Sequence, residues 1–234
     1  MSPTLHWMGG WASNFHCWEL LLQEEYSGYN HRFLDTHEFL NHDFAHTGLD
    51  SLPGKHVVVA WSMGSLLCHL WIERGQWPLN LPLLSLCPVF QFSQGGFAKP
   101  ILLKMGKKLS QDRKEVLRDF WRQMPKAETI TPIHEQLWLE GTETYSTESL
   151  IQGLKFLAET HVNPHSLSVL PHRWELMVGD QDRLSPTGAW ELTLIEKGLL
   201  HALVHYPGGH LPFFDHPKLV SHSLQQLLIN SQNL

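Results

Sequence analysis

The segment from Val57 to Ser65 constrains this chain more than any other part of its sequence. Its letters are VVVAWSMGS, so a β-branched run ends in a turn of small residues around Ser62, and an apolar helical pattern follows. Such a run is typical of a strand buried on both faces of a parallel sheet. Ala60 and Gly64 leave the space that a sharp turn needs. The segment therefore predicts a strand, a strained turn that presents the Ser62 hydroxyl, and a helix.

Strand and helix patterns alternate on both sides of this segment. We expect strands at 4–8, 31–34, 56–60, 83–87, 173–178 and 202–206, and helices at 18–25, 65–74, 189–197 and 217–229. From about 90 to 162 the pattern is mostly helical, with breaks at the glycine pair 95–96 and at prolines 125 and 132. The alternation predicts an α/β fold with a mostly parallel central sheet and helices on both faces.

Length and composition predict one domain with a full core. The chain has 234 residues, of which 42% are hydrophobic and 17% charged, unlike a disordered protein. We expect residues 1–89 and 166–234 to form the core and 90–165 an inserted helical cap. No apolar run is long enough for a membrane span and no signal peptide is evident, so we expect a cytoplasmic protein. Cys17, Cys68 and Cys87 form neither a disulfide framework nor a CxxC metal pair.

A late loop offers the base that an activated serine needs. The chain has 17 histidines, so a histidine by itself carries little information. His210 stands on a glycine-rich loop after the last expected strand and just before the final helix, where a general base has room to approach. His205 is expected to be a strand side chain, and His216 a helix cap. His210 is therefore the predicted base.

The acid that orients this base is expected on the preceding loop. A strand is predicted to end at Gly179, and Asp182 lies three residues into the loop that follows. Asp180 is the rival, although an aspartate at that position more commonly shapes a turn. Serine, acid and histidine in this chain order, each after a strand, are typical of the α/β-hydrolase fold, and the loop tip favours Asp182.

An oxyanion in such a site needs two backbone N–H donors. One is expected from Met63, directly after the serine. The other is expected from the loop at 9–14, after the first strand, where we favour the N–H of Trp11. A simple glycine turn with an exposed tryptophan is the alternative interpretation of that loop.

Positive charge is concentrated in one segment. Between Lys99 and Lys126 there are nine bases and three acids, although the whole chain has a formal net charge of -6. This asymmetry indicates an acidic partner, and a solvated helix face is the alternative. The acidic remainder of the chain argues against a nucleic-acid-binding protein.

From Gly9 onward the chain resembles the pimeloyl-[acyl-carrier protein] methyl ester esterases of biotin synthesis. The similar strings are residues 10–14 with Trp18, residues 61–64, residues 109–110 with 120–124, residues 154–157 leading to 173–186, and residues 210–213 with 216–217. The chain departs from the family at Gly9, where the family has histidine. Some basic cap positions of the family fall here on Glu115 and Asp119.

The resemblance implies an ester hydrolase that removes the methyl group from a pimeloyl ester on acyl-carrier protein. We expect a monomer that needs no cofactor or metal. It implies a catalytic set of Ser62, Asp182 and His210, with Trp11 and Met63 as oxyanion and substrate contacts. It implies a substrate channel lined by Phe120, Trp121, Arg122, Gln123 and Met124. A basic cap would dock the carrier, and we expect Lys107, Lys108, Lys114 and Arg118 to contribute.

Other functions remain open. A generic short-chain carboxylesterase or thioesterase would have the same three catalytic residues but would need no basic platform. A non-catalytic ligand-binding protein of the same fold is a third hypothesis. The spacing of His37, His42 and His46 allows a metal site, but no further ligand pattern supports one, so we expect surface histidines.

Overall fold

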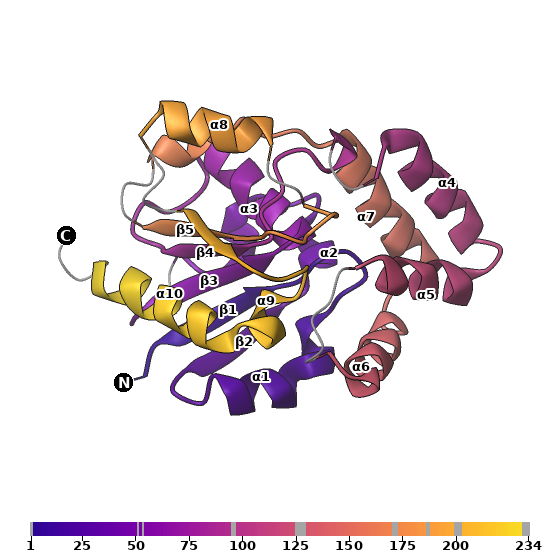
Figure 1. Ribbon diagram of the computed structural model, residues 1–234, viewed down its shortest axis with the longest axis horizontal. Helices are drawn as coiled ribbons and strands as arrows, with labels where there is room; N and C mark the ends of the chain where they lie inside the picture. Colours follow the sequence, from indigo (N-terminus) through magenta and orange to yellow (C-terminus); the bar gives the residue numbers. More distant parts are fainter. Residues whose placement is uncertain are drawn as a thin grey trace.

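A parallel sheet forms the centre of the computed structural model, which describes residues 2–50, 52, 54–94, 97–124, 130–169, 173–185, 188–198 and 203–230. In these residues the sheet has six strands in the order β2-β1-β3-β4-β5-β6, and each adjacent pair is parallel (Figure 1). The strands are β1 (Thr4–Met8), β2 (Asn30–Leu34), β3 (His56–Trp61), β4 (Leu83–Leu86), β5 (Trp174–Gly179) and β6 (Leu203–Tyr206). The predicted α/β-hydrolase fold class is confirmed.

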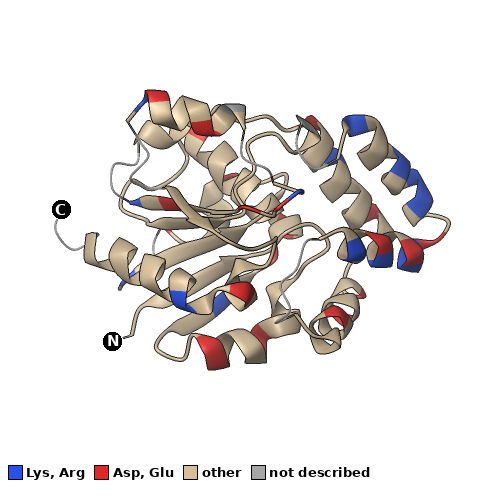
Figure 2. Ribbon diagram, in the orientation of Figure 1, with Lys and Arg blue, Asp and Glu red and all other residues tan. Residues whose placement is uncertain are grey.

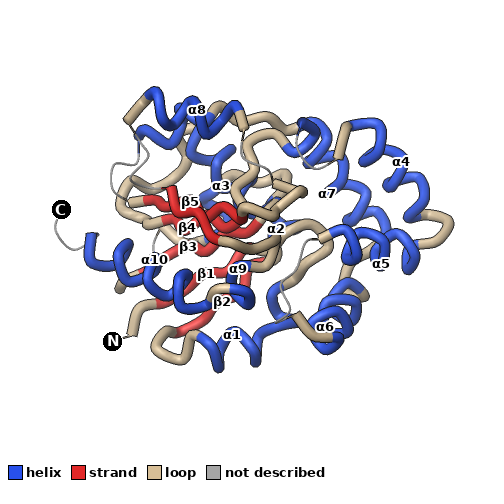
Figure 3. Tube along the Cα trace, in the orientation of Figure 1, coloured by secondary structure: helices blue, strands red, loops and turns tan. Residues whose placement is uncertain are grey.

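Helices cover both faces of the sheet (Figures 1 and 3). One face is covered by α1 (Glu19–Glu25), α9 (Pro212–Asp215) and α10 (Pro217–Asn230), and the other by α3 (Met63–Glu73) and α8 (Ala189–Glu196). A short helix, α2 (Thr36–Phe39), follows β2. Between β4 and β5 the chain forms α4 (Lys99–Leu109), α5 (Arg113–Gln123), α6 (Pro132–Thr142) and α7 (Thr147–Glu159), which lie together at one end of the molecule (Figure 1).

Most element boundaries lie within one or two residues of those expected. The helix expected from 65 begins at Met63, because the turn at Ser62 leads directly into it. The expected break at Pro132 is confirmed, because α6 begins there after the cap Thr131. The missing N–H of proline is harmless at this position, because the first helical N–H groups have no acceptor. The expected breaks at 95–96 and 125, and the expected strand start at 202, lie outside the described residues.

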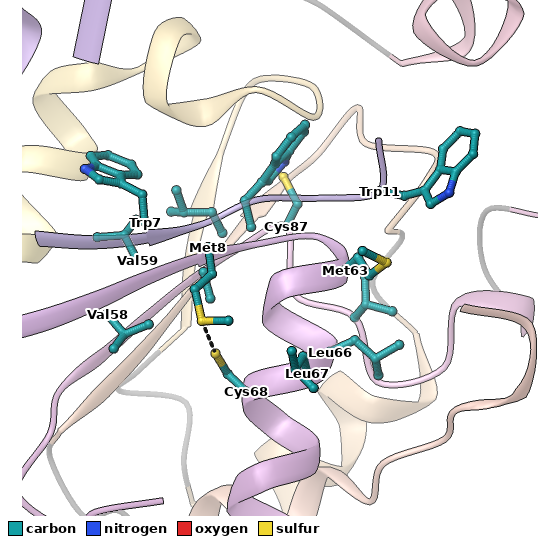
Figure 4. Close-up of a cluster of buried hydrophobic side chains, with 14 of the residues drawn as sticks. Trp7, Met8, Trp11, Val58, Val59, Met63, Leu66, Leu67, Cys68 and Cys87 are labelled. Atoms are coloured by element: carbon teal, nitrogen blue, oxygen red, sulfur yellow. Dashed lines mark hydrogen bonds between the residues drawn. The ribbon is translucent and has the colours of Figure 1, made fainter. Parts of the chain in front are cut away.

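Strand β3 and helix α3 are almost completely buried. Val57, Val58 and Val59 have no exposed surface, since helices pack on both faces of the central strand. Nearly the whole of α3 is buried as well. Cys68 of α3 and Met8 at the end of β1 meet with their sulfur atoms 3.6 Å apart (Figure 4). The helix that follows Ser62 is therefore held firmly against the sheet.

All strands point the same way, so the loops that follow them emerge at one edge of the sheet. Ser62 follows β3, Asp182 lies in the loop after β5, and His210 follows β6. The helices α4 to α7 lie at this same end (Figure 1). None of the helices in the described ranges combines the length and the apolar character that a membrane span requires.

Candidate active site

Ser62 occupies a strained turn between β3 and α3. Its φ of 54° and ψ of -113° are unusual for a residue with a side chain, and such conformations cost about 1–3 kcal/mol. Its N–H donates to the carbonyl of Leu86 over 3.0 Å, which fixes the turn to β4. A Cβ on Gly64 would lie 2.6 Å from the carbonyl oxygen of Met8, so only glycine allows α3 to approach β1 this closely. The local sequence thus produces the predicted turn.

Asp182 and His210 form a buried hydrogen-bonded pair. The distance from His210 Nδ1 to Asp182 Oδ2 is 2.7 Å, and the two side chains are 1% exposed or less. The other carboxylate oxygen accepts the N–H groups of Leu184 and Ser185 over 2.9 and 3.2 Å. With the acid ionised, the shared proton belongs on Nδ1, and Nε2 of the imidazole is left as the acceptor.

The surroundings keep Asp182 charged. Burial opposes ionisation of its carboxyl, but the charge and hydrogen bond of His210, together with the donors Cys87 and Leu184, outweigh burial and lower its pKa below the ordinary value. Asp180, the rival acid, is exposed and binds His205 Nδ1 over 3.1 Å instead. The structure therefore brings Asp182, and not Asp180, to His210.

Trp61 connects the serine turn to the histidine loop. Its indole nitrogen donates to the carbonyl oxygen of His210 over 2.7 Å, and the two rings lie 5.3 Å apart. Among the described residues, no hydrogen bond joins Ser62 Oγ to His210. Such bonds are often long before substrate binds. Because Trp61 directly precedes Ser62 and binds the backbone of His210, Ser62 lies next to the loop that carries His210.

The loop after β1 lies against the serine. A Cβ on Gly10 would be 3.2 Å from Cβ of Ser62, so this loop approaches the serine closely. In the described part of the chain the backbone N–H groups of Trp11 and Met63 donate to no protein acceptor. Ala12, the next residue, has a φ of 55°. The two predicted oxyanion donors are thus both available next to Ser62.

The alternative interpretation of this loop required an exposed side chain for Trp11, but the side chain is buried. It is 2% exposed, donates from Nε1 to the carbonyl of Leu150 over 2.9 Å, and meets the ring of Phe120 edge-on at 4.8 Å. Trp11 therefore joins the loop after β1 to helices α5 and α7.

The five predicted channel residues separate into two groups. Phe120 and Trp121 are 5% and 1% exposed, and both rings stack on Trp138. The other three line a cavity of about 830 Å³ between the end of α5 and the loop after β5. Its lining residues are Arg122, Gln123, Met124, Asp180, Gln181, Asp182 and Arg183. Phe120 and Trp121 are thus packed among aromatic residues outside this cavity.

The predicted carrier-docking residues lie on the helix pair α4 and α5, where Figure 2 shows Lys and Arg gathered at one end of the molecule. Lys108 forms ion pairs with Glu115 at 3.0 Å and with Asp119 at 3.8 Å. Lys107, Lys114 and Arg118 are exposed and have no ion pair with any described residue. The acids of α5 therefore neutralise only part of the predicted set. Lys126 lies outside the described residues.

Cys87, Asp182 and His210 bring their potential metal-ligand atoms within 4.8 Å of one another. Among the described residues, no other group of three such side chains does so. Burial raises the pKa of the Cys87 thiol well above its ordinary value, so it is a poor thiolate ligand. Both Asp182 oxygens already accept hydrogen bonds. This chemistry suits an acid–base pair better than a metal ion. His37, His42 and His46 do not form such a group.

Two residues that contact the loops of the candidate site were not identified from the sequence. His37 was considered only as a metal ligand, yet its Nε2 lies 3.3 Å from the N–H of Ala12. Cys87 was considered only for a disulfide or a CxxC metal pair, yet its thiol lies 3.5 Å from the carbonyl oxygen of His210. Both contacts join residues far apart in the chain. The position of Cys87 at the end of an expected strand was the one local signal available.

Comparisons with known proteins agree with this architecture. No curated protein matches the chain in sequence. An esterase from Exiguobacterium antarcticum superposes with a TM-score of 0.70 at 16% identity, covering 98% of this chain and 92% of that one. A bromoperoxidase from Bacillus anthracis gives 0.74 at 14% identity, with coverages of 98% and 92%. MenH from S. aureus gives 0.69 at 13% identity, with coverages of 99% and 95%.

Identities this low show a shared fold and leave the reaction open, as an esterase and a bromoperoxidase on one fold illustrate. A model of the alpha/beta hydrolase family matches residues 6–222. Because that match spans most of the sequence and the sheet has the corresponding architecture, this chain belongs to the alpha/beta hydrolase family.

Proposed function

We propose that the chain is a serine esterase that cleaves the methyl ester of a pimeloyl group carried on acyl-carrier protein. The observation that carries the esterase part is the buried 2.7 Å pair of Asp182 and His210 beside Ser62 on its strained turn. A serine hydroxyl is a weak nucleophile unless an oriented base accepts its proton. These three residues supply the nucleophile, the base and the orienting acid.

In the first half of the reaction, Ser62 Oγ attacks the ester carbonyl and His210 Nε2 takes the hydroxyl proton. Asp182 stays ionised and stabilises the imidazolium that forms. The oxyanion of the tetrahedral intermediate accepts from the N–H groups of Trp11 and Met63. When the intermediate collapses, the bond to the methoxy group breaks, and His210 gives its proton to the departing methanol.

In the second half, water replaces the alcohol. His210 Nε2 takes a proton from water as the water oxygen attacks the acyl group on Ser62. The same two N–H donors bind the second oxyanion. Collapse breaks the bond to Ser62 Oγ, which recovers its proton from His210, and the free carboxylic acid leaves. No redox step or cofactor is needed for this sequence.

The carrier-bound substrate is supported by the resemblance of the sequence and by the exposed bases of α4 and α5. An acidic carrier protein would be attracted to Lys107, Lys114 and Arg118, since complementary charge raises the rate of encounter. Lys108 contributes less to this surface than expected, because Glu115 and Asp119 pair with it. We therefore assign the docking role mainly to the three unpaired bases.

The direct test is incubation of the purified protein with methyl pimeloyl-acyl-carrier protein. We expect the carrier to lose the mass of one methylene group, and the Ser62→Ala protein to leave it unchanged. Turnover in both proteins would contradict the role of Ser62. Cleavage of p-nitrophenyl esters without demethylation would favour the generic esterase or thioesterase, and binding without any turnover would favour the non-catalytic alternative.

Charge reversal tests docking separately from chemistry. We expect the double variant Lys107→Glu/Lys114→Glu to lower kcat/KM on the carrier-bound ester by about 10-fold or more at low salt. Its activity on a p-nitrophenyl ester should be unchanged. The matched control is Lys55→Glu/Lys218→Glu, which alters the net charge equally at exposed lysines outside α4 and α5. Equal losses in the two double variants would rule out docking on α4 and α5.

A further inference from the structure

Three hydrogen bonds tie the loop that carries the Trp11 donor to helix α7. The N–H of Ala12 points to Nε2 of His37 over 3.3 Å. Nδ1 of the same ring lies 3.1 Å from the carbonyl oxygen of Ser149, in the first turn of α7. The indole of Trp11 donates to the carbonyl of Leu150, the next residue of that turn. The oxyanion loop and α7 are thus linked at two consecutive carbonyls.

The donors and acceptors define the state of His37. A backbone N–H can only donate, so Nε2 must be unprotonated to accept from Ala12. A carbonyl can only accept, so Nδ1 must carry the proton that reaches Ser149. Burial favours this neutral ring, lowering the pKa of His37 to about 4. A neutral imidazole with its proton on Nδ1 satisfies both neighbours.

Close packing makes the link rigid. A Cβ on Gly153, one turn along α7, would lie 2.6 Å from Cε1 of His37 and 2.7 Å from Cδ1 of Trp11. Tyr145 packs its ring 4.4 Å from that of His37, and its hydroxyl donates over 3.0 Å to Asp35, the residue that caps α2. The helix that carries His37 is therefore held by both the core and the segment before α7.

The hydrogen bond from Ala12 to His37 affects the backbone at Trp11, whose N–H is the proposed oxyanion donor. The N–H of Ala12 belongs to the peptide unit that follows Trp11, so holding it fixes the backbone on one side of Trp11. The indole hydrogen bond fixes the side chain. Ala12 has a φ of 55°, a conformation that relaxes unless its surroundings hold it. Without His37 the loop would have a route to a more ordinary backbone conformation.

We propose that His37 is a positioning residue, which orients the Trp11 N–H toward the developing oxyanion by tying the Ala12 amide to the first turn of α7. This inference rests on the proposed function, since it matters for turnover only where the N–H of Trp11 stabilises an oxyanion. If His37 has this role, the orientation of the Trp11 N–H depends on the position of α7. Small displacements of a catalytic donor lower rates by up to about 10²-fold.

The test compares His37→Leu, which removes all hydrogen bonds of the ring, with His37→Gln, whose amide offers an acceptor and a donor. With p-nitrophenyl acetate we expect His37→Leu to lower kcat by about 10- to 100-fold with little change in KM. Affinity for a trifluoromethyl ketone, which forms a tetrahedral adduct with serine, should fall by a similar factor. His37→Gln should retain most of the wild-type kcat and most of the affinity for the ketone. Amide hydrogen exchange at Ala12 should be faster in His37→Leu alone.

A second buried histidine controls for general damage. His69 bonds the carbonyl of Val89 over 3.1 Å and stacks on Phe90, so His69→Leu should lower stability without the loss of kcat. If His37→Leu does not fold, Gly153→Ala should lower kcat in the same way by displacing α7. In that case Gly106→Ala, in the adjacent helix α4, is the control.

Two results would overturn the inference: equal kcat losses in His37→Leu and His69→Leu, or unchanged exchange of the Ala12 amide in His37→Leu. Failure of the proposed function has a different signature. If the proposed serine-esterase chemistry fails, the wild-type protein cleaves neither p-nitrophenyl acetate nor the carrier-bound ester. If only the carrier-bound substrate is wrong, the protein still cleaves p-nitrophenyl acetate. The exchange rate of Ala12 would still decide whether His37 holds the loop.

Discussion

The indole nitrogen of Trp61 donates a 2.7 Å hydrogen bond to the backbone carbonyl of His210, across 149 positions of the chain. Trp61 is the residue immediately before Ser62, so the strand that presents the serine also holds the loop that presents the histidine. The thiol of Cys87 lies 3.5 Å from the same carbonyl oxygen. The placement of the His210 loop next to Ser62 is therefore held by a buried side chain and not by the glycine-rich loop alone.

Trp61→Phe should lower esterase kcat by about 10- to 100-fold, because the His210 loop loses its anchor while the ring still fills the core. The lost bond should also reduce stability by about 1–3 kcal/mol. Trp77→Phe is the matched control, since Trp77 forms a similar 2.9 Å bond to Leu81. Steady-state kinetics and urea unfolding check both. Equal activity in the two variants would contradict the anchoring role.

Asp182→Asn should lower kcat by about 10⁴-fold, the loss seen when an amide replaces the acid in a serine–histidine–aspartate site. The amide cannot stabilise the imidazolium, and it favours the wrong tautomer of His210. Asp180→Asn should lower kcat for a p-nitrophenyl ester far less, because Asp180 is exposed and binds His205 instead of His210. A large loss in the Asp180 variant with a small one in the Asp182 variant would reverse the assignment.

Gly64→Ala should destabilise the protein by about 1–3 kcal/mol and lower activity, because its Cβ would overlap the carbonyl oxygens of Met8 and Gly9 at 2.6 and 2.8 Å. Gly106→Ala in α4 provides the contrast. Its Cβ would meet only Ile151 and Leu154 at 3.9 and 4.0 Å, so the higher helix propensity of alanine should raise stability by up to about 1 kcal/mol. Urea unfolding of the two variants should show a lower free energy of unfolding for Gly64→Ala and a higher one for Gly106→Ala.

Acid should destabilise the protein through its buried histidines. Burial lowers the pKa of His69 to about 4, and burial with the nearby His56 and Arg32 lowers that of His6 to about 3, from an ordinary 6.5. The unfolded chain binds these protons first, so stability is complete above about pH 6.5 and falls as the pH drops toward 4.

Each such histidine contributes a slope of up to about 1.4 kcal/mol per pH unit in that window. Urea unfolding at several pH values should show it, and His69→Leu should make the slope shallower. A slope identical to that of the wild-type protein would contradict the burial of a neutral ring at this site. The variant is compared at each pH with its own value at neutral pH, which removes the effect of lost packing.

Much of the fold followed from local patterns. The valine run could be assigned to a buried strand because it has no polar alternation, and the small residues around Ser62 required a turn there. The break at Pro132 was also predicted correctly, since proline interrupts a helix in its interior and is accommodated at its first position, where α6 begins. The charge of α4 and α5 was visible in sequence, but the pairing of Lys108 with Glu115 and Asp119 was not, because it depends on the packing of two helices.

The sequence by itself determined the strand–turn–helix around Ser62 and the two later loops that carry an acid and a base, because each depends on residues that are neighbours in the chain. Only the tertiary structure decided between Asp180 and Asp182, since the loop turns one carboxylate inward to His210 and the other outward to His205. It also decided the contacts of His37 with Ala12 and Ser149, which span 25 and 112 positions. Hydrogen bonds between such distant residues form only when the sheet and helices bring them together, and no local pattern encodes them.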